Sequence, residues 1–217
     1  MDALHAHATQ VAPKEPYITT RTTRRISTTT SVSAAASAIR CAPTTPSILG
    51  SGGHTGELLQ MLKELDFNKF TACYFISAHN DKNSFTKAKE VIPINSFTKT
   101  KFEFKTIYRS RNVGQSFASS IFTFAYALIH AVLILIKTRP TIMVTNGPGV
   151  AVPLVYIGYL MKLVGIMAEF KILFIESYCR TKSISMSGKM VKPICDRFIV
   201  LWESIKGGKA EYIGKIL

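Results

Sequence analysis

The sequence is poor in acidic side chains. Its 217 residues contain only 13 aspartates and glutamates against 27 lysines and arginines, which gives a formal net charge of +14. Basic residues gather in the ranges 82–111 and 180–209. Such a surface favours an anionic partner, either nucleic acid, anionic lipid head groups or a diphosphate, although basic blocks are also typical of solvated loops.

The chain also lacks the cysteine patterns of metal sites and disulfide frameworks. Its four cysteines, Cys41, Cys73, Cys179 and Cys195, form no CxxC pair. We therefore expect no metal site, no disulfides and a reducing cytosolic environment. Zinc-finger spacing, an RNP-like aromatic motif and a helix-turn-helix signature are missing too, which argues against nucleic acid as the partner.

Large apolar residues are scarce in residues 1–46, which hold 14 serines and threonines. This composition predicts a disordered tail. The bias toward arginine, serine and threonine between Arg21 and Arg40 also resembles a transit peptide. No uninterrupted apolar segment is present there, which argues against a secretory signal.

One glycine-rich octet, residues 50–57 with the sequence GSGGHTGE, stands between a short apolar run and an amphipathic one. It is neither a dinucleotide fingerprint, because Thr55 replaces the required glycine, nor a P-loop, because Gly-Lys-Ser/Thr is absent. Glycines and a helix N-terminus together suit a phosphate group. We predict a phosphate cradle made by Gly52, Gly53, His54, Thr55 and Gly56, the alternative being a turn that binds nothing.

Short apolar runs alternate with helical segments from residue 47 to residue 217, which predicts an α/β domain with a Rossmann-like, mainly parallel sheet. The expected strands are 47–49, 71–77, 104–108, 141–145, 171–175, 198–201 and 210–213, and the expected helices are 54–65, 84–91, 113–137, 149–163 and 183–191. The prolines at 43 and 46 argue against central pairing of the segment before residue 47.

Ligands bind beyond the carboxyl ends of the strands in such sheets. The turns at 50–57, 146–149 and 176–180 all follow predicted strands, and we expect them to meet at one crevice. This adds Asn146, Gly147 and Gly149 to the candidate binding residues.

Residues 113–136 include no Asp, Glu, Lys or Arg. An uncharged stretch of this length can span a bilayer. Three interpretations remain open: a helix docked in the membrane surface, a buried helix covering the sheet, or a true span. The flanking residues Arg109, Arg111, Lys137 and Arg139 suit anionic lipid in the first case. For the apolar segment 150–167 an ordinary sheet-packing helix is favoured, with Pro153 in its first turn.

Six motifs in order carry a family resemblance. They are 50–57 (GSGGHTGE), 109–116 (RSRNVGQS), 146–149 (NGPG), 174–180 (FIESYCR), 185–189 (SMSGK) and 196–202 (DRFIVLW). With them the chain closely resembles, over residues 47–217, the membrane-anchoring subunit of the two-subunit UDP-N-acetylglucosamine transferase of dolichol-linked oligosaccharide synthesis.

The resemblance implies the N-terminal, acceptor-side half of a GT-B glycosyltransferase. A soluble catalytic subunit would bind UDP-N-acetylglucosamine, and the two chains together would add the second GlcNAc to GlcNAc-diphosphate-dolichol on the cytosolic face of the endoplasmic reticulum. Neither a cofactor nor activity of this chain alone is expected. The alternatives are a single-chain transferase, which the short chain disfavours, and a membrane-recruiting scaffold without substrate contact.

The residues offer chemistry for this reaction. Arg109 and Arg111 suit the diphosphate, and His54 or Glu176 could take the proton of the acceptor hydroxyl. The alternative for His54 is a hydrogen-bonding residue at a helix start. The alternative for Glu176 is a structural partner for an arginine or a backbone amide.

Both ends of the chain bear on membrane and partner binding. Many relatives carry a transmembrane anchor ahead of the glycine loop, which residues 1–46 lack. We therefore expect either attachment through the 113–136 surface or a biological start other than Met1.

At the other end the apolar C-terminus is expected to contact the catalytic subunit, or to pack as a last edge strand, through Tyr212, Ile213, Lys215, Ile216 and Leu217.

Overall fold

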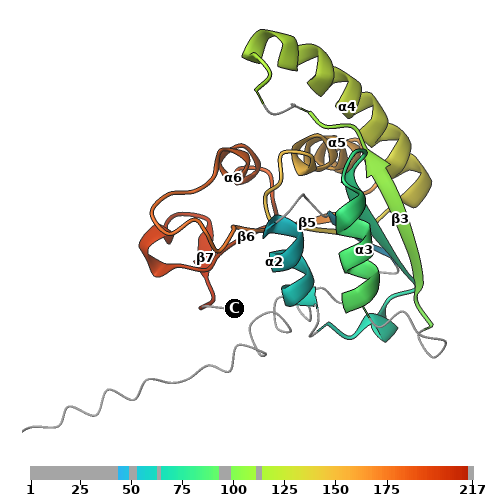
Figure 1. Ribbon diagram of the computed structural model, residues 1–217, viewed down its shortest axis with the longest axis horizontal. Coiled ribbons are helices and arrows are strands. Elements are labelled where there is room, and N and C mark those ends of the chain that lie inside the picture. The colour runs from blue at the N-terminus through green and yellow to red at the C-terminus, as the bar shows by residue number, and fades with distance from the viewer. Residues whose placement is uncertain (1–43, 49–52, 63–64, 93–98, 111–113, 215–217) are drawn as a thin grey trace, which may run out of the picture.

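The computed structural model describes residues 44–48, 53–62, 65–92, 99–110 and 114–214 (Figure 1). Within them lies a seven-stranded sheet in the order β3-β2-β1-β4-β5-β6-β7, and every registered pair of neighbouring strands is parallel. This is the 3-2-1-4-5-6 order of Rossmann folds with β7 added at one edge. The predicted Rossmann-like, parallel α/β architecture is confirmed.

All the expected strands and helices are present, with bounds shifted by a few residues. The strands are β1 (Thr44–Ile48), β2 (Ala72–Ala78), β3 (Lys101–Ile107), β4 (Ile142–Thr145), β5 (Lys171–Ile175), β6 (Arg197–Val200) and β7 (Ala210–Tyr212). The helices are α2 (Gly53–Leu62), α3 (Lys82–Val91), α4 (Phe117–Thr138), α5 (Ala151–Leu163) and α6 (Met186–Val191), with 3-10 turns η1 (Phe67–Lys69) and η2 (Glu203–Ile205).

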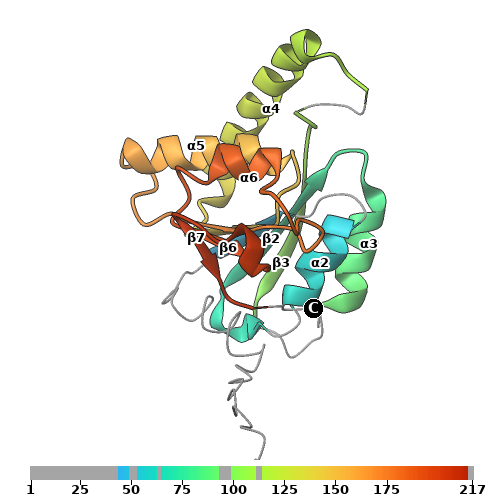
Figure 2. The same ribbon diagram turned by 90° about the vertical axis from the view of Figure 1, so that its left-hand side faces the viewer.

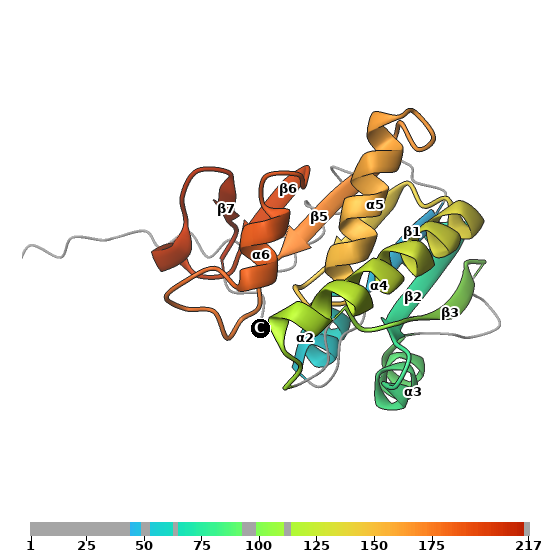
Figure 3. The same ribbon diagram turned by 90° about the horizontal axis from the view of Figure 1, so that it is seen from above.

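Helices cover both faces of the sheet. Figure 2 shows α5 and α6 on one face and α2 and α3 on the other, and Figure 3 shows α4 beside α5 on the first face. Side chains alternate between the two cores along each strand. In β5, Ile172 and Phe174 join the core under α4, α5 and α6, whereas Leu173 and Ile175 join the core under α2 and α3.

The expected start of the first strand was wrong. β1 begins at Thr44 and holds Pro46 within the central part of the sheet. It pairs with β2 along its whole length, but β4 pairs only with Ser47 and Ile48. Pro46 therefore lies where only one neighbour is registered, so its missing N–H need not break a ladder on both sides. Residues 1–43 lie outside the described residues, and their disorder stays a prediction.

Serine caps explain why two helices begin later than expected. The Ser116 hydroxyl accepts a hydrogen bond from Ser119 N at 3.3 Å and starts α4, and the Ser185 hydroxyl accepts one from Gly188 N at 2.9 Å and starts α6. Each serine satisfies an amide that the first turn would otherwise leave unpaired. The prediction that Pro153 lies in the first turn of α5 is confirmed, and α5 packs on the sheet as expected.

α4 is the one helix among the described residues that is long and apolar enough to cross a membrane, because its 21 residues Ala118–Thr138 reach a mean hydropathy of 2.1. Only 22% of the apolar 18-residue window within them is buried. The buried residues, from Ala127 through Leu135 to Thr138, recur on one stripe of its C-terminal part. α4 therefore covers the sheet with one stripe and leaves apolar side chains uncovered elsewhere.

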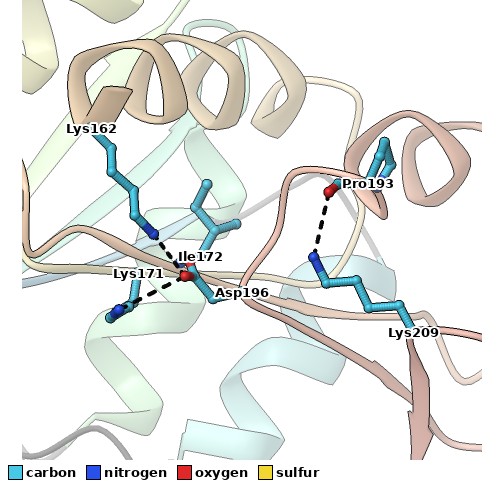
Figure 4. A network of polar contacts seen from close by, with 6 residues as sticks. All are labelled: Lys162, Lys171, Ile172, Pro193, Asp196 and Lys209. Atoms are coloured by element: carbon cyan, nitrogen blue, oxygen red, sulfur yellow. Dashed lines mark hydrogen bonds and ion pairs between the residues drawn. The ribbon is translucent and has the colours of Figure 1, made fainter. Parts of the chain in front are cut away.

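A polar network fixes the amino end of β5 (Figure 4). Asp196 accepts a hydrogen bond from Ile172 N at 2.8 Å through Oδ2, and its Oδ1 lies 2.7 Å from Lys162 Nζ of α5. Lys171 Nζ is 3.9 Å from the same oxygen. The network joins α5 to the strand that carries part of the site at its other end.

Candidate functional site

The described parts of the three predicted turns, residues 53–57, 146–149 and 176–180, meet at the carboxyl edge of the sheet, beyond the adjacent strands β1, β4 and β5. There they line a pocket of about 400 Å³, which we call the polar pocket. Its volume is in the range of small-molecule sites, roughly 300–1,000 Å³. The lining residues come from α2, the two loops and the start of α6: Gly53, His54, Glu57, Gly147, Ser177, Cys179, Arg180, Ser185, Met186 and Ser187.

His54, in the first turn of α2, is held by the loop after β4. Its Nδ1 lies 3.1 Å from the carbonyl oxygen of Asn146, and the Asn146 side-chain amide donates to the His54 carbonyl oxygen at 2.6 Å. Because a carbonyl only accepts, Nδ1 carries the proton in the neutral ring. Nε2 then presents a lone pair and contacts no other polar group in the described part of the chain. This geometry suits a general base.

Glu57, one turn along α2, connects the same loops. Its Oε1 accepts a hydrogen bond from the Ser177 hydroxyl at 3.0 Å, and its Oε2 lies 3.4 Å from the Asn146 amide nitrogen. Cys179 Sγ is 3.7 Å from Oε1. Glu57 therefore connects α2 to the loops after β4 and β5 at the rim of the polar pocket.

The loop after β4 needs glycine at residue 147. Gly147 has a φ of 98°, and a Cβ there would lie 3.3 Å from Phe174 Cζ. Its carbonyl oxygen accepts a hydrogen bond from the Ser187 hydroxyl at 2.6 Å. The start of α6 is thus attached directly to the loop that holds His54.

Glu176 is completely buried at the end of β5. It accepts hydrogen bonds from Ser177 N at 3.0 Å, from Ser185 N at 2.9 Å and from the Ser185 hydroxyl at 3.1 Å. A Cβ at Gly188 would lie 2.6 Å from Glu176 Oε2, so α6 packs against the carboxylate without space for a side chain. These contacts favour the structural interpretation of Glu176 over the catalytic one.

Arg180 brings a positive charge to the polar pocket. It is exposed, and its guanidinium makes no hydrogen bond or ion pair within the described residues. Three serines and the first residues of α2 also line the wall, together with the Glu57 carboxylate. The Arg180 cation suits an anionic, oxygen-rich ligand.

Several predicted site residues do not line this pocket. Thr55 is fully buried and its hydroxyl lies 2.6 Å from Ser84 Oγ of α3, because the next residue on a helix points about 100° away from His54. Gly56 is exposed outside the pocket. Gly149 accepts a hydrogen bond from the Ser110 hydroxyl at 3.0 Å.

Arg109 lies in a different pocket, with Tyr108 and α4, because β3 is an edge strand that β2 separates from β1. Tyr212 and Ile213 are partly buried at and just after β7, the opposite edge strand. Gly52, Arg111, Lys215, Ile216 and Leu217 lie outside the described residues. Their predicted roles stay predictions.

Sequence reasoning missed Glu57, Arg180, Ser185 and Ser187 as site residues. Each belongs to one of the motifs that carried the resemblance, which was the available signal. Their approach to His54 depends on contacts between residues far apart in the chain. No cluster of three or more potential metal ligands occurs among the residues that the structure describes.

Comparison with known proteins shows which family the sequence belongs to. Residues 45–216 match the family described as "Oligosaccharide biosynthesis protein Alg14 like". The chain is 38% identical over 172 residues to a Candida albicans protein named UDP-N-acetylglucosamine transferase subunit ALG14, covering 78% of this chain and 76% of the relative. The human protein of the same name is 33% identical over 179 residues, covering 78% and 81%.

The fold also resembles a solved structure. MurG of Acinetobacter baumannii, a GT-B glycosyltransferase, superposes with a TM-score of 0.55 at 14% identity. The match covers 79% of this chain but 45% of MurG, so the chain spans less than half of that protein. The likeness supports the fold, and the sequence matches support the family. The chain belongs to the Alg14 family of oligosaccharide biosynthesis proteins.

Proposed function

We propose that the chain is the acceptor-side subunit of a UDP-N-acetylglucosamine transferase that adds the second GlcNAc to GlcNAc-diphosphate-dolichol. A soluble catalytic subunit supplies UDP-GlcNAc, and transfer takes place on the cytosolic face of the endoplasmic reticulum membrane. The observation that carries the proposal is the contact of His54 Nδ1 with the Asn146 carbonyl, which leaves Nε2 available in a pocket that Arg180 also lines.

In this mechanism the acceptor sugar occupies the polar pocket. Its hydroxyl forms the new bond to the anomeric carbon of GlcNAc, gives its proton to His54 Nε2, and UDP leaves with the bonding electron pair. The Asn146 carbonyl steadies the imidazolium that results, because Nδ1–H points at it at 3.1 Å. Glu57 and Glu176 hold the surrounding loops and take no part in proton transfer.

The diphosphate is bound by charge and by oriented donors. α2 has ten residues and begins at Gly53 in the pocket wall, so its N-terminal amides carry a partial positive charge. Arg180 adds a full charge, whereas the Ser177 and Ser187 hydroxyls donate to Glu57 and to the Gly147 carbonyl and so shape the wall instead. We assign to Arg180 the contact with the sugar-side phosphate of the diphosphate.

Membrane attachment is assigned to the face that carries α4. Every large apolar side chain that is exposed in the described residues comes from α4, α5, α6 or the segments beside them. On α4 they include Ile121, Phe122 and Ile129, which are 68%, 79% and 62% exposed. A helix that also packs on the sheet through a buried stripe is suited to lie in a lipid surface rather than to cross it.

A catalytic partner is consistent with the relatives, whose names describe a subunit. A GT-B enzyme has two Rossmann-like halves, and the described residues form one sheet. We place the partner along the β7 edge, at Tyr212 and Ile213, and expect the contact to continue to Lys215, Ile216 and Leu217.

The test is transfer of labelled GlcNAc from UDP-GlcNAc to a GlcNAc-diphosphate lipid, with this chain alone, the catalytic subunit alone, and both together. We expect transfer only with both. Arg180→Met should then raise the KM for the acceptor about tenfold or more, because it removes a charged hydrogen bond to phosphate, and should leave the KM for UDP-GlcNAc unchanged.

Lys182→Met is the matched control, because it removes an exposed charge two residues away that does not line the pocket. Transfer by this chain alone would establish the single-chain alternative. Full activity of the catalytic subunit on a soluble acceptor without this chain would favour the recruiting scaffold, as would an acceptor KM that Arg180→Met leaves unchanged.

A further inference from the structure

A second pocket, of about 330 Å³, lies at the same edge of the sheet and has a different character. Its walls come from residues just after β2 and β3 and from the first turns of α4, and they include His79, Tyr108, Arg109, Phe122 and Tyr126. We call it the aromatic pocket. The mechanism above does not use it.

Tyr108 organises the wall. Its ring stacks on His79 with centroids 5.2 Å apart and meets the Tyr126 ring edge-on at 4.7 Å. His130, one turn further along α4, lies 5.3 Å from the same ring. Rings that pack against one another in this way form a rigid, largely apolar surface. Such a surface suits a hydrocarbon more than a sugar.

Arg109 is the charged residue of this pocket, and it has no partner for its guanidinium within the described residues. Its Nε is shielded from solvent and donates a hydrogen bond to no described group. Leaving such a donor unpaired away from water costs free energy. An anionic oxygen from a ligand would remove this penalty, so the pocket combines an apolar wall with one anion-binding donor.

The aromatic pocket is joined to the polar pocket on one side. The Ser110 hydroxyl donates to the Gly149 carbonyl at 3.0 Å, and the Thr123 hydroxyl of α4 donates to the Ser110 carbonyl at 2.8 Å. The segment that carries Tyr108 and Arg109 therefore connects α4 to the loop that holds His54. On its other side, Phe122 and Tyr126 belong both to the aromatic pocket and to the exposed apolar face of α4.

We propose that the aromatic pocket binds the isoprene units nearest the diphosphate of the lipid acceptor, with Arg109 on the lipid-side phosphate. The inference rests on the proposed function and deepens it. The sugar end lies in the polar pocket, the first isoprenes lie against Tyr108 and Phe122, and the remaining chain leaves along α4 into the lipid surface. Recognition of the acceptor thus depends on the beginning of its chain as well as on its head.

The experiment uses the full chain with its catalytic subunit in detergent and a series of GlcNAc-diphosphate acceptors. One carries a methyl group, and the others carry one to four isoprene units. For the parent we expect the KM to fall with each of the first isoprene units and then to level off. Phe122→Ser should raise the KM of the isoprenyl acceptors at least fivefold and leave that of the methyl acceptor unchanged, because it removes apolar contact area only.

Phe122 is 79% exposed, so its substitution does not threaten the fold. Ile129→Ser is the matched control, because Ile129 is exposed on α4 but does not line the pocket. Any effect of this control should be equal for all chain lengths. Arg109→Met should raise the KM for every diphosphate acceptor, the methyl one included.

Cross-linking gives an independent measurement. A photoreactive isoprenyl diphosphate should label Tyr108 or the first turns of α4 in the parent complex, and the label should be lost in Phe122→Ser. A KM that does not depend on chain length, or equal effects of Phe122→Ser and Ile129→Ser, would overturn this inference while transfer itself persists. Absence of transfer to every acceptor would instead mean that the proposed function is wrong.

Discussion

Glu176→Gln tests whether the buried carboxylate is a structural anchor. The carboxylate is fully buried and accepts three hydrogen bonds, from Ser177 N, Ser185 N and the Ser185 hydroxyl. Glutamine is nearly isosteric, but it keeps one acceptor oxygen. If that oxygen accepts the two hydrogen bonds from Ser185, the new amide nitrogen faces Ser177 N. Both groups are then donors, so the hydrogen bond from Ser177 N is lost.

The expected loss follows from these bonds. Hydrogen bonds to a charged group contribute about 1.5–3 kcal/mol each, and an unsatisfied buried donor costs about 1–3 kcal/mol. One bond is lost entirely and two are weakened, so we expect the free energy of unfolding to fall by about 2–4 kcal/mol. This is a large share of the roughly 5–15 kcal/mol that stabilises a typical domain.

Urea unfolding of the full chain measures this loss, with the fluorescence of its one tryptophan as the signal. Trp202 donates to the Tyr178 carbonyl at 2.7 Å and so reports on the loop that begins at Glu176. Glu169→Gln, the same change at an exposed position, should shift stability by less than about 0.5 kcal/mol. If Glu176→Gln is as stable as the parent but transfers no sugar, the anchoring argument is wrong and the residue takes part in chemistry.

Three further predictions concern other parts of the molecule. Iodoacetamide should label the exposed Cys179 in the native chain, and a GlcNAc-diphosphate acceptor should slow that labelling. Burial raises the pKa of the Cys73 thiol to about 12, so Cys73 should react only after unfolding. Burial, with a smaller effect of a nearby histidine, lowers the pKa of His130 below 6.5. The unfolded chain therefore binds the proton first, and the free energy of unfolding should fall as the pH drops through 6.5. His130→Phe should flatten this pH dependence in urea titrations between about pH 7 and 5. Lys162→Met should lower the free energy of unfolding by about 1 kcal/mol, because it removes the ammonium 2.7 Å from Asp196. Lys171→Met should change it by less than about 0.5 kcal/mol, because the Lys171 ammonium is 3.9 Å from Asp196 and its side chain is half exposed. Equal losses would contradict this ranking.

Much of the fold was predictable because its strands are short apolar runs between polar residues. Lys171–Ile175 was predicted with its final bounds, since Ile172 to Ile175 are buried on both faces of a parallel sheet. β1 was predicted three residues short, because Thr44, Thr45 and Pro46 carry no apolar pattern. Their place in the sheet comes from backbone pairing with β2, which composition does not encode.

The site was predictable only in part, for a related reason. The rule that ligands bind beyond strand ends led to His54 and Gly147, because each stands immediately after a strand or in the first turn of the next helix. Arg109 also follows a strand, but the strand order places it in the aromatic pocket. Arg180 and Ser187 reach the polar pocket through a loop and a short helix held by Glu176, and such contacts are not visible in local sequence patterns.

The central claim is that His54 Nε2 accepts the proton of the acceptor hydroxyl, and His54→Asn tests it most directly. The asparagine amide can still donate to the Asn146 carbonyl in place of Nδ1, so the variant removes the base and keeps the anchor. Gln60→Ala, on the exposed side of α2, is the control for the helix. With both subunits present and acceptor saturating, we expect kcat of His54→Asn to fall by about 10²–10⁴-fold with an unchanged melting temperature. A kcat within about threefold of the parent would contradict the account.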